Sequence, residues 1–414
     1  MTVGQRRVAF CTPPHYGGIY SVFRRIREAV AGHGWDVIAV HPKSESSRWY
    51  GYDERLAGDG VVSVSVGGGG LQEEAKNLTR WFVENDVAIV IPMSLPPALA
   101  AVPHLPESIR VVTRCINVTP HAYRLATWGL PWIDRVVFTS PRQAEDLKAR
   151  YRVDASLLSH VPNAVDVSRL AIPRPTQRQG QGLRLVFLDR LEHTQKRVLM
   201  LPGLLERLDR DNVAFDIVII GDGPDRNRLA DDLQPWVARG VARFVGSVPN
   251  DEVGAYLSQA DVLVKMSRNE GFPSSVIEAM AAGVVPVVSH LRGVTDWIVQ
   301  HEKTGLLCPL DNVSDFAAAC RRLDRDRRLL RNMSEAASRD VGERFDIAGF
   351  GRNWSRVFEE VMRQPRRTPP LAWQRFRTPL PYRGTLAHRI LWRHVPRSWK
   401  DRARAMAENL SVDR

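Results

Sequence analysis

The chain has 414 residues, 44% of them hydrophobic and 25% charged, so it can bury a large core, and its length indicates two domains of ordinary size. Its four cysteines, Cys11, Cys115, Cys308 and Cys320, stand far apart, which argues against a zinc site or a disulfide framework and is typical of a reducing cytoplasm. The net charge of +12 is concentrated in residues 365–414, where twelve Arg or Lys against three Asp or Glu leave +9.

The sequence shows neither a secretion signal nor a membrane-spanning segment. Residues 1–7 lead directly into a strand-like run at 8–10, without the apolar block of a secretion signal. The longest apolar region, residues 87–102, is interrupted by Pro92, Pro96 and Pro97 and is too short to span a bilayer. We therefore expect a cytoplasmic protein.

The first half of the chain alternates apolar, strand-like runs with spacers of helical length. This alternation predicts right-handed crossovers and a parallel sheet, which together form a Rossmann-like domain over residues 1–170. The runs are residues 8–11, 37–40, 61–66, 87–91, 111–113 and 136–139.

The turn after the first run, residues 12–19, holds Gly17 and Gly18 and opens a helix over residues 21–30. Paired glycines allow a ligand to approach the backbone, and the helix N-terminus behind them favours an anion. An ordinary tight turn explains the same pattern, so both interpretations stay open.

A polar, Pro- and Gly-rich stretch at residues 171–182 predicts a linker, after which the alternation restarts. We predict a second doubly wound α/β domain over residues 183–345. Its expected strands are residues 185–188, 215–220, 242–245, 262–264 and 285–288, and its closing helices are residues 313–323, 327–344 and 347–363.

Two carboxylates, Glu270 and Glu278, lie on a loop and helix between the apolar runs 260–264 and 284–288. Ligands bind at the carboxyl ends of parallel strands, so Glu270 is expected at the sheet rim and Glu278 about two turns into the helix. The N–H groups of residues 271–275 would favour hydroxyl or phosphate oxygens. Glycosidases also use a pair of carboxylic acids as catalytic residues, and spacing alone does not exclude a hydrolase.

An ordered set of short motifs extends over nearly all of residues 7–362. Together they resemble the retaining, nucleotide-sugar-dependent glycosyltransferases of the GT-B fold, in particular the family-4-like group marked by Glu-x7-Glu. The resemblance implies two Rossmann-like domains that face each other across a cleft, with the helix at residues 346–364 returning to the N-terminal domain. The motifs are Gly17-Gly18 and residues 161–166, 187–191, 195–197, 220–224, 244–246, 270–278 and 304–307.

The resemblance also implies roles for individual residues. Arg190 and Lys196 would hold the donor diphosphate, where negative charge grows as the sugar leaves. Glu278 would bind the ribose and Glu270 the donor sugar. Further donor contacts are implied for Gly17, Gly18, Val248, Gly271, Phe272, Pro273 and Ser274. The catalytic set is Glu270, Arg190, Lys196 and His121.

The sequence departs from the family pattern at several positions. Asp189 stands where a Gly usually precedes the phosphate-binding Arg, and Ala164 replaces another usual Gly. In residues 111–121 the family places a His near the reacting carbon, and this chain has Ile116 or Asn117 there. Either His121 substitutes from the next turn, or it is an ordinary polar residue at a helix start.

The resemblance predicts a retaining hexosyltransferase that uses a UDP- or GDP-sugar and a hydroxyl acceptor in cell-surface glycan, polysaccharide or glycolipid synthesis. We expect no metal, because both Asp-x-Asp patterns, residues 209–211 and 324–326, fall in charged helix ends. Two alternatives remain. One is a weakly active or inactive glycosyltransferase-like protein that binds nucleotide or glycan, and the other is a glycoside phosphorylase or epimerase on the same fold.

The basic tail, residues 365–414, mixes arginine with aromatic residues and prolines. A short helix around Leu386, Arg389, Ile390, Leu391 and Arg393 would suit an anionic membrane surface, and a peripheral site on the inner face of the plasma membrane would bring lipid-linked acceptors within reach. The alternative is a tail that packs back across both domains or is partly disordered. No nucleic-acid motif accompanies the charge, which disfavours nucleic acid as a partner. The sequence carries no indication of oligomeric state.

Overall fold

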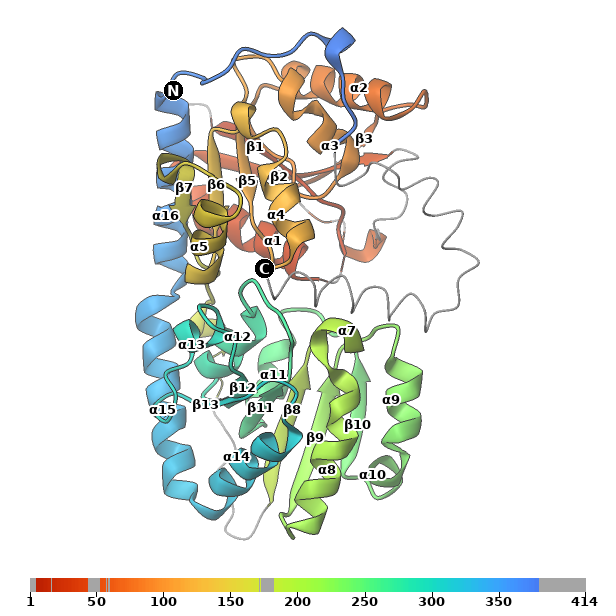
Figure 1. The fold of residues 1–414 in the computed structure, drawn as a ribbon, viewed down its shortest axis with the longest axis vertical. Helices are drawn as coiled ribbons and strands as arrows, with labels where there is room; N and C mark the ends of the chain where they lie inside the picture. Colours follow the sequence, from red (N-terminus) through yellow and green to blue (C-terminus); the bar gives the residue numbers. More distant parts are fainter. Residues whose placement is uncertain are drawn as a thin grey trace. The chain divides into compact units, whose positions relative to one another are not determined.

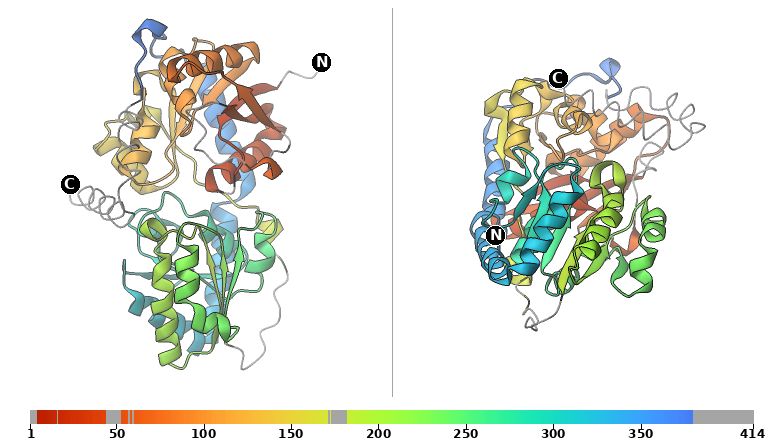
Figure 2. Two further views of the ribbon diagram at one scale, coloured as in Figure 1. Left: turned by 90° about the vertical axis from the view of Figure 1, so that its right-hand side faces the viewer. Right: turned by 60° about the horizontal axis from the view of Figure 1, so that its bottom comes forward.

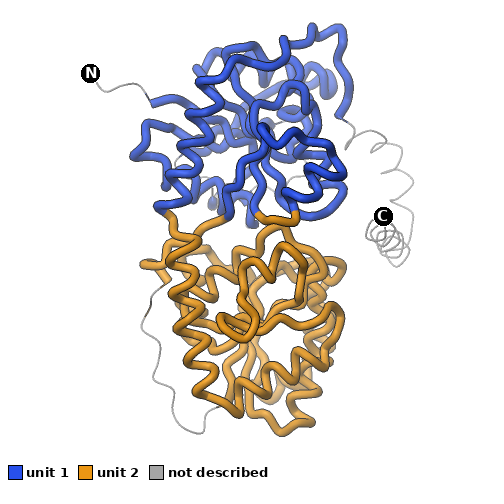
Figure 3. Tube along the Cα trace, turned by 60° about the vertical axis from the view of Figure 1, so that its left-hand side comes forward, with its two compact units in different colours: residues 1–139, 143–162, 348–414 blue, residues 140–142, 163–347 orange. Residues whose placement is uncertain are grey.

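The computed structural model describes residues 5–15, 17–43, 53–56, 58, 60–170, 172 and 182–379. The chain forms two compact units, shown in two colours in Figure 3. Unit 1 contains residues 1–139, 143–162 and 348–414, and unit 2 contains residues 140–142 and 163–347. Most of the predicted linker, residues 171–182, lies outside the described residues.

Unit 1 is built on a seven-stranded parallel sheet with the order β3-β2-β1-β4-β5-β6-β7 (Figure 1). Its inner strands β2, β4 and β5 contain several Val or Ile residues and are buried along most of their length, as expected for a parallel sheet covered on both faces, whereas the edge strands β3 and β7 are mostly not buried. They are β1 (Arg6–Cys11), β2 (Trp35–Lys43), β3 (Val61–Ser65), β4 (Val87–Ile91), β5 (Arg110–Arg114), β6 (Arg135–Phe138) and β7 (Leu158–His160).

Helices cover both faces of this sheet (Figure 2). On one face, the Phe23 ring of α1 (Gly18–Val30) lies 5.8 Å from the Phe10 ring of β1. Helix α16 (Ile347–Arg363) packs beside α1, and a Cβ at Gly351 would meet the Ala29 carbonyl oxygen at 2.4 Å. The remaining helices of this unit are α2 (Leu71–Glu84), α3 (Pro96–Ala101), α4 (Pro120–Thr127) and α5 (Pro141–Ala149).

Unit 2 is built on a six-stranded parallel sheet with the order β10-β9-β8-β11-β12-β13. From β8 the chain runs outward through β9 to β10, and it then returns to β11 on the other side of β8. The order therefore reverses between β8 and β11, which makes the carboxyl ends of these two strands a topological switch point. The strands are β8 (Leu183–Leu188), β9 (Phe215–Ile220), β10 (Ala242–Gly246), β11 (Val262–Lys265), β12 (Val285–Ser289) and β13 (Leu306–Cys308).

Two apolar layers enclose the sheet of unit 2. One lies under α8 (Leu201–Arg210) and α14 (Val313–Arg325), which cross one face of the sheet in Figure 1. The other lies under α11 (Val253–Leu257) and α12 (Ser274–Ala281), with the second half of α15 (Arg327–Arg344). The remaining helices are α6 (Val167–Leu170), α7 (His193–Lys196), α9 (Arg226–Asp232), α10 (Gln234–Ala238) and α13 (Thr295–Ile298).

The prediction of two Rossmann-like α/β domains is confirmed. Two edge strands, β7 and β13, were not predicted as strands, because each has only three residues and pairs with a single neighbour. Unit 2 begins eight residues before the predicted boundary, since the Val165 N–H donates to the Phe345 carbonyl oxygen (2.9 Å) and Leu170 lies in the core of unit 2. Among the described helices, none is both long and apolar enough to cross a membrane.

The described part of the tail, residues 365–379, packs on unit 1. The Trp373 ring stacks on His104 with centroids 4.2 Å apart, and the Leu371 N–H donates to the Pro103 carbonyl oxygen (2.7 Å). Arg366 donates to the carbonyl oxygen of Pro106 (2.7 Å). This part therefore follows the packed alternative. The helix predicted around Leu386 and the rest of residues 380–414 lie outside the described residues.

Candidate functional site

Four charged side chains meet at the switch point of unit 2. Lys196 Nζ, at the end of α7, lies 2.9 Å from Asp189 Oδ1 and 2.8 Å from Glu270 Oε1. Lys265, the last residue of β11, contacts Asp189 Oδ2 and lies 3.0 Å from Glu270 Oε1. We call these four residues the charge quartet. Each ammonium contacts both carboxylates, so the four form a closed ring of ion pairs.

The charge quartet is buried, with side-chain exposed fractions between 4% and 14%. Burial by itself would raise the pKa of Asp189 and of Glu270, but the ammonium groups of Lys196 and Lys265 outweigh it and lower both. Burial would lower the pKa of Lys196, and the two carboxylates instead raise it. All three groups are therefore charged at neutral pH.

Close backbone packing fixes the β8 side of the site. Gly221 has a φ of +132°, and a Cβ there would lie 1.9 Å from the Asp189 carbonyl oxygen. A Cβ at Gly223 would lie 2.4 Å from the Leu191 carbonyl oxygen. Only glycine lets the loop after β9 lie so close to the segment that carries Asp189.

Helix α7 is tied to the loop that precedes Glu270. The Glu192 carboxylate caps α7 by accepting hydrogen bonds from the N–H groups of Thr194 and Gln195. The Gln195 amide donates to the Asn269 carbonyl oxygen (3.0 Å), and the Arg268 N–H donates to the Gln195 carbonyl oxygen (2.8 Å). These bonds hold Lys196 opposite Glu270.

The start of α12 carries the other residues of the Glu-x7-Glu stretch. Gly271, Phe272 and Pro273 are buried, and the Phe272 ring packs against the Phe345 ring at 5.4 Å. Ser274 Oγ accepts a hydrogen bond from Asn163 (2.9 Å), which joins two of the motifs recognised in the sequence. Glu278 is half-buried on α12.

Two further predicted residues of unit 2 lie outside the charge quartet. The Arg190 side chain is exposed and makes no hydrogen bond or ion pair with another described residue, while its N–H donates to Asp189 Oδ1 (2.9 Å). Val248 is half-buried in the loop after β10. Arg190 therefore directly follows Asp189 in the chain, and its guanidinium is available to a ligand.

Three predicted residues belong to unit 1. Gly17 precedes α1 in an extended conformation, where a Cβ would meet the His15 ring at 2.9 Å, and Gly18 is the first residue of α1 with open space beside it. His121 is exposed near the start of α4, and partial desolvation together with the charge of Arg124 lowers its pKa. No distance between these residues and the charge quartet is defined, because they belong to different units. Their joint role therefore stays a prediction.

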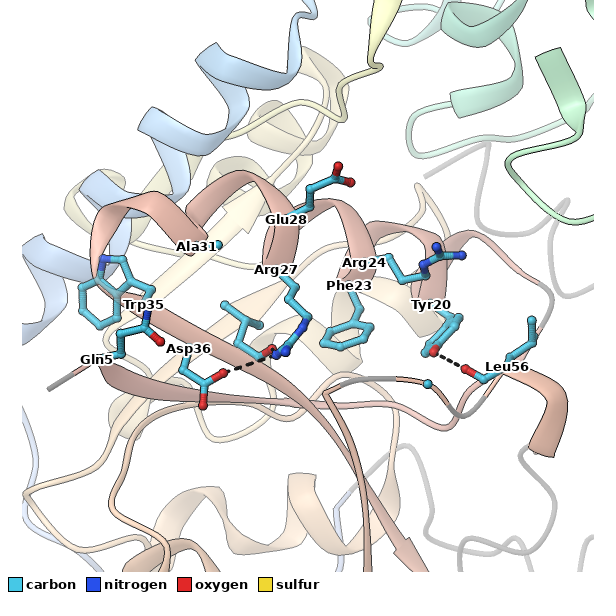
Figure 4. Close-up of a pocket in the computed structure, with 12 residues that line it drawn as sticks. Gln5, Tyr20, Phe23, Arg24, Arg27, Glu28, Ala31, Trp35, Asp36 and Leu56 are labelled. Atoms are coloured by element: carbon cyan, nitrogen blue, oxygen red, sulfur yellow. Dashed lines mark hydrogen bonds and ion pairs between the residues drawn. The ribbon is translucent and has the colours of Figure 1, made fainter. Parts of the chain in front are cut away.

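A separate pocket of about 540 Å³ runs along α1 in unit 1 (Figure 4). Two of its polar side chains are paired with other lining groups: Arg27 contacts Asp36 (3.3 Å) and the Val37 carbonyl oxygen (2.6 Å), and the Tyr20 hydroxyl donates to the Leu56 carbonyl oxygen (2.6 Å). None of the predicted site residues lines it. Within the described residues, no group of three or more His, Cys, Asp or Glu could hold a metal ion.

The sequence matches two families, Glycosyltransferase Family 4 over residues 16–169 and Glycosyl transferases group 1 over residues 168–340. The two matches overlap by two residues and together span residues 16–340. The chain belongs to the family-4-like glycosyltransferases of the GT-B fold.

Two curated relatives and one solved structure illustrate this membership. A glycogen synthase of Mycobacterium tuberculosis is 25% identical over 60% of this chain and 59% of its own length, so the chain matches less than two thirds of that relative. A phosphatidyl-myo-inositol mannosyltransferase of Mycolicibacterium smegmatis is 24% identical over 83% of this chain and 90% of its own. HepE of Anabaena, solved in complex with UDP, has a TM-score of 0.69 at 13% identity and covers 86% of this chain and all of its own.

In this member of the family, sequence reasoning missed the part that Lys265 and Asp189 play in the site. Lys265 ends an apolar strand, and Asp189 was interpreted only as a departure from the family pattern. One signal was available, because Lys265 continues the apolar run Val262-Leu263-Val264 without a break, and an ammonium that is buried at the end of a strand needs ionic partners.

Proposed function

We propose that this protein transfers a sugar from a nucleotide diphosphate sugar to a hydroxyl acceptor. The observation that carries the proposal is the charge quartet at the switch point of unit 2, where doubly wound sheets bind their ligands. Lys196 and Arg190, which directly follows Asp189 in the chain, would bind the diphosphate and stabilise the charge that grows on it as the sugar leaves.

The donor is a UDP- or GDP-sugar. HepE, which has the same fold, was solved with UDP, and this supports a nucleotide donor here. Glu278, half-buried on α12, would accept hydrogen bonds from the ribose hydroxyls, and the loop at Val248 would border the base. Glu270 would accept hydrogen bonds from the donor sugar, assisted by the N–H groups of residues 271–274. No metal is required, because side-chain cations supply the positive charge.

The reaction proceeds with retention at the anomeric carbon. The bond from that carbon to the leaving phosphate oxygen breaks, the acceptor oxygen bonds to the carbon on the same face, and the acceptor proton passes to the leaving phosphate. Gly17, Gly18 and His121 are proposed to contact the donor from unit 1. With its lowered pKa, His121 is neutral at pH 7 and could accept a hydrogen bond there.

The acceptor is a cell-surface glycan, polysaccharide or glycolipid. Relatives are named for such products, among them a putative colanic acid biosynthesis glycosyltransferase of Escherichia coli and the phosphatidyl-myo-inositol mannosyltransferase. We propose that residues 380–414, which hold most of the tail's positive charge, bring the enzyme to an anionic membrane at the inner face of the plasma membrane.

Liposome flotation tests the membrane part. The full chain should float with anionic vesicles, whereas chains that end at Pro379 or at Gln364 should both stay behind. A chain ending at Pro379 keeps the packed segment, so it separates the two parts of the tail. Equal flotation of all three chains would contradict membrane binding through residues 380–414.

A panel of nucleotide sugars and simple hydroxyl acceptors tests the activity, with NMR of the product to report the anomeric configuration. The expected result is donor consumption with an α-product from an α-donor. Binding without turnover would favour an inactive glycosyltransferase-like protein. Dependence on free phosphate would indicate a phosphorylase, and conversion without an acceptor would indicate an epimerase.

A further inference from the structure

The two lysines of the charge quartet differ in the hydrogen bonds they have left. An ammonium has three N–H donors. Lys265 uses all three, on Asp189 Oδ2, Glu270 Oε1 (3.0 Å) and Ser275 Oγ (3.4 Å). Lys196 uses two, on Asp189 Oδ1 and Glu270 Oε1, and within the described residues its third donor has no partner. Lys196 can therefore bind a ligand while it stays in the ring, and Lys265 cannot.

Burying the Lys265 ammonium costs desolvation free energy, which its ion pairs in the site must offset. It is 3% exposed and ends a strand whose other residues are Val262, Leu263 and Val264, all buried. Removing an ammonium from water is compensated only by close opposite charges. Those charges are Asp189 and Glu270, and the same two carboxylates hold Lys196.

Lys265 keeps the net charge of the quartet at zero. With both lysines, the quartet carries two positive and two negative charges. Without Lys265, two carboxylates would face a single ammonium, and the excess negative charge would repel an anionic diphosphate. Without the Asp189 charge, the excess would be positive, and Lys196 would lose one of the two carboxylates that fix its direction.

We propose that Asp189 and Lys265 are a positioning pair of the donor site, which holds Lys196 and Glu270 in place and keeps the site neutral so that Lys196 can present its third N–H to the donor diphosphate. The proposal rests on the proposed function. Asp189 and Lys265 would not contact the donor themselves and would act on it through Lys196 and Glu270.

Neutral substitutions that keep hydrogen-bonding groups separate charge from packing. Lys265→Gln should weaken UDP or GDP binding about tenfold, since one positive charge is lost beside an anion in a partly screened site. Asp189→Asn should strengthen nucleotide binding about threefold and at the same time lower turnover about tenfold, because Lys196 is less well directed. The double variant, again neutral, should bind nucleotide within about twofold of the original protein.

The matched control is Asp261→Asn, which disturbs a buried ion pair on the same two strands at their other ends. It should lower the thermal midpoint and leave nucleotide affinity unchanged. A merely structural role for Asp189 and Lys265 would lower stability and affinity together in every variant.

Calorimetric titration with UDP and GDP, after a thermal-unfolding check that each variant folds, decides between the outcomes. Opposite changes in affinity for the two single variants, with recovery in the double, support the positioning pair. Changes of the same sign, or a double variant no better than Lys265→Gln, overturn it. If Lys265→Gln does not fold, the double variant and Asp189→Asn still decide. Absence of nucleotide binding by the original protein overturns the proposed function itself.

Discussion

Strands β8 and β11 bury charge at both ends, and the two ends are built differently. At the amino ends, Arg184 and Asp261 form a bidentate pair, with Nη2–Oδ1 at 2.7 Å and Nε–Oδ2 at 3.0 Å, and the Arg184 N–H also donates to Asp261. At the carboxyl ends, one donor of Lys196 has no partner among the residues that the structure describes. Buried charge alone therefore does not mark a site. A better mark of a binding site is a buried charged group that keeps an unused hydrogen-bond donor at the carboxyl ends of strands where the sheet order reverses.

The largest effect on activity is expected for Lys196→Met, at the carboxyl ends of β8 and β11. This change removes the ammonium that is shared by Asp189 and Glu270 and is proposed to hold the diphosphate. Turnover with the preferred donor should fall about 10²- to 10³-fold, the cost of losing one preorganised group at a developing charge. Steady-state kinetics checks it. Turnover within a factor of three of the original would remove Lys196 from the chemistry.

Asp261→Asn probes the amino ends. The remaining Arg184 guanidinium would lose its bidentate carboxylate and keep only the electrostatic attraction of Asp216, so the free energy of unfolding should fall by about 3 kcal/mol. Urea denaturation measures this loss. Donor KM and kcat should be unchanged, and a change in either would mean that the two ends of the strands are coupled.

Lowering the pH should reduce the stabilisation that the charge quartet provides at the carboxyl ends of β8 and β11, and it should do so in a defined pH window. The folded-state pKa values of Asp189 and Glu270 are lowered by the two ammonium groups, so their stabilisation is full above the unfolded-state values of about 4 and is lost as the pH falls through the folded values. The gap in unfolding free energy between the original protein and Asp189→Asn should be constant from pH 7 to about 5 and should shrink below about 4. Urea titrations at stepped pH test this, and a gap that widens on acidification would contradict it.

Glu278→Gln should have the smallest effect. Glu278 is half-buried on α12 and is proposed to bind the ribose equally in the ground and transition states. Donor KM should rise about tenfold with kcat unchanged. Glu206→Gln, on the exposed side of α8, serves as the control and should leave both constants as they are. A fall in kcat for Glu278→Gln alone would place this carboxylate nearer the reacting carbon.

Much of this molecule follows from local patterns. Strand β9 and helices α15 and α16 have the predicted bounds, because long apolar runs and strong helical periods set them. Motifs also singled out Lys196 and Glu270, which the structure brings to 2.8 Å. The pairing of Lys265 with Asp189 could not be predicted, because the two residues are 76 positions apart and meet only where β8 and β11 lie side by side.

Nucleotide-linked stabilisation of three proteins tests the central claim most directly. UDP and GDP would be added to the original protein, to Lys196→Met and to Asp261→Asn, and the shift in thermal midpoint would be compared. At least one nucleotide should raise the midpoint of the original protein and of Asp261→Asn by the same amount, and should leave Lys196→Met unmoved. An undiminished shift in Lys196→Met would show that the nucleotide does not bind at the carboxyl ends of β8 and β11.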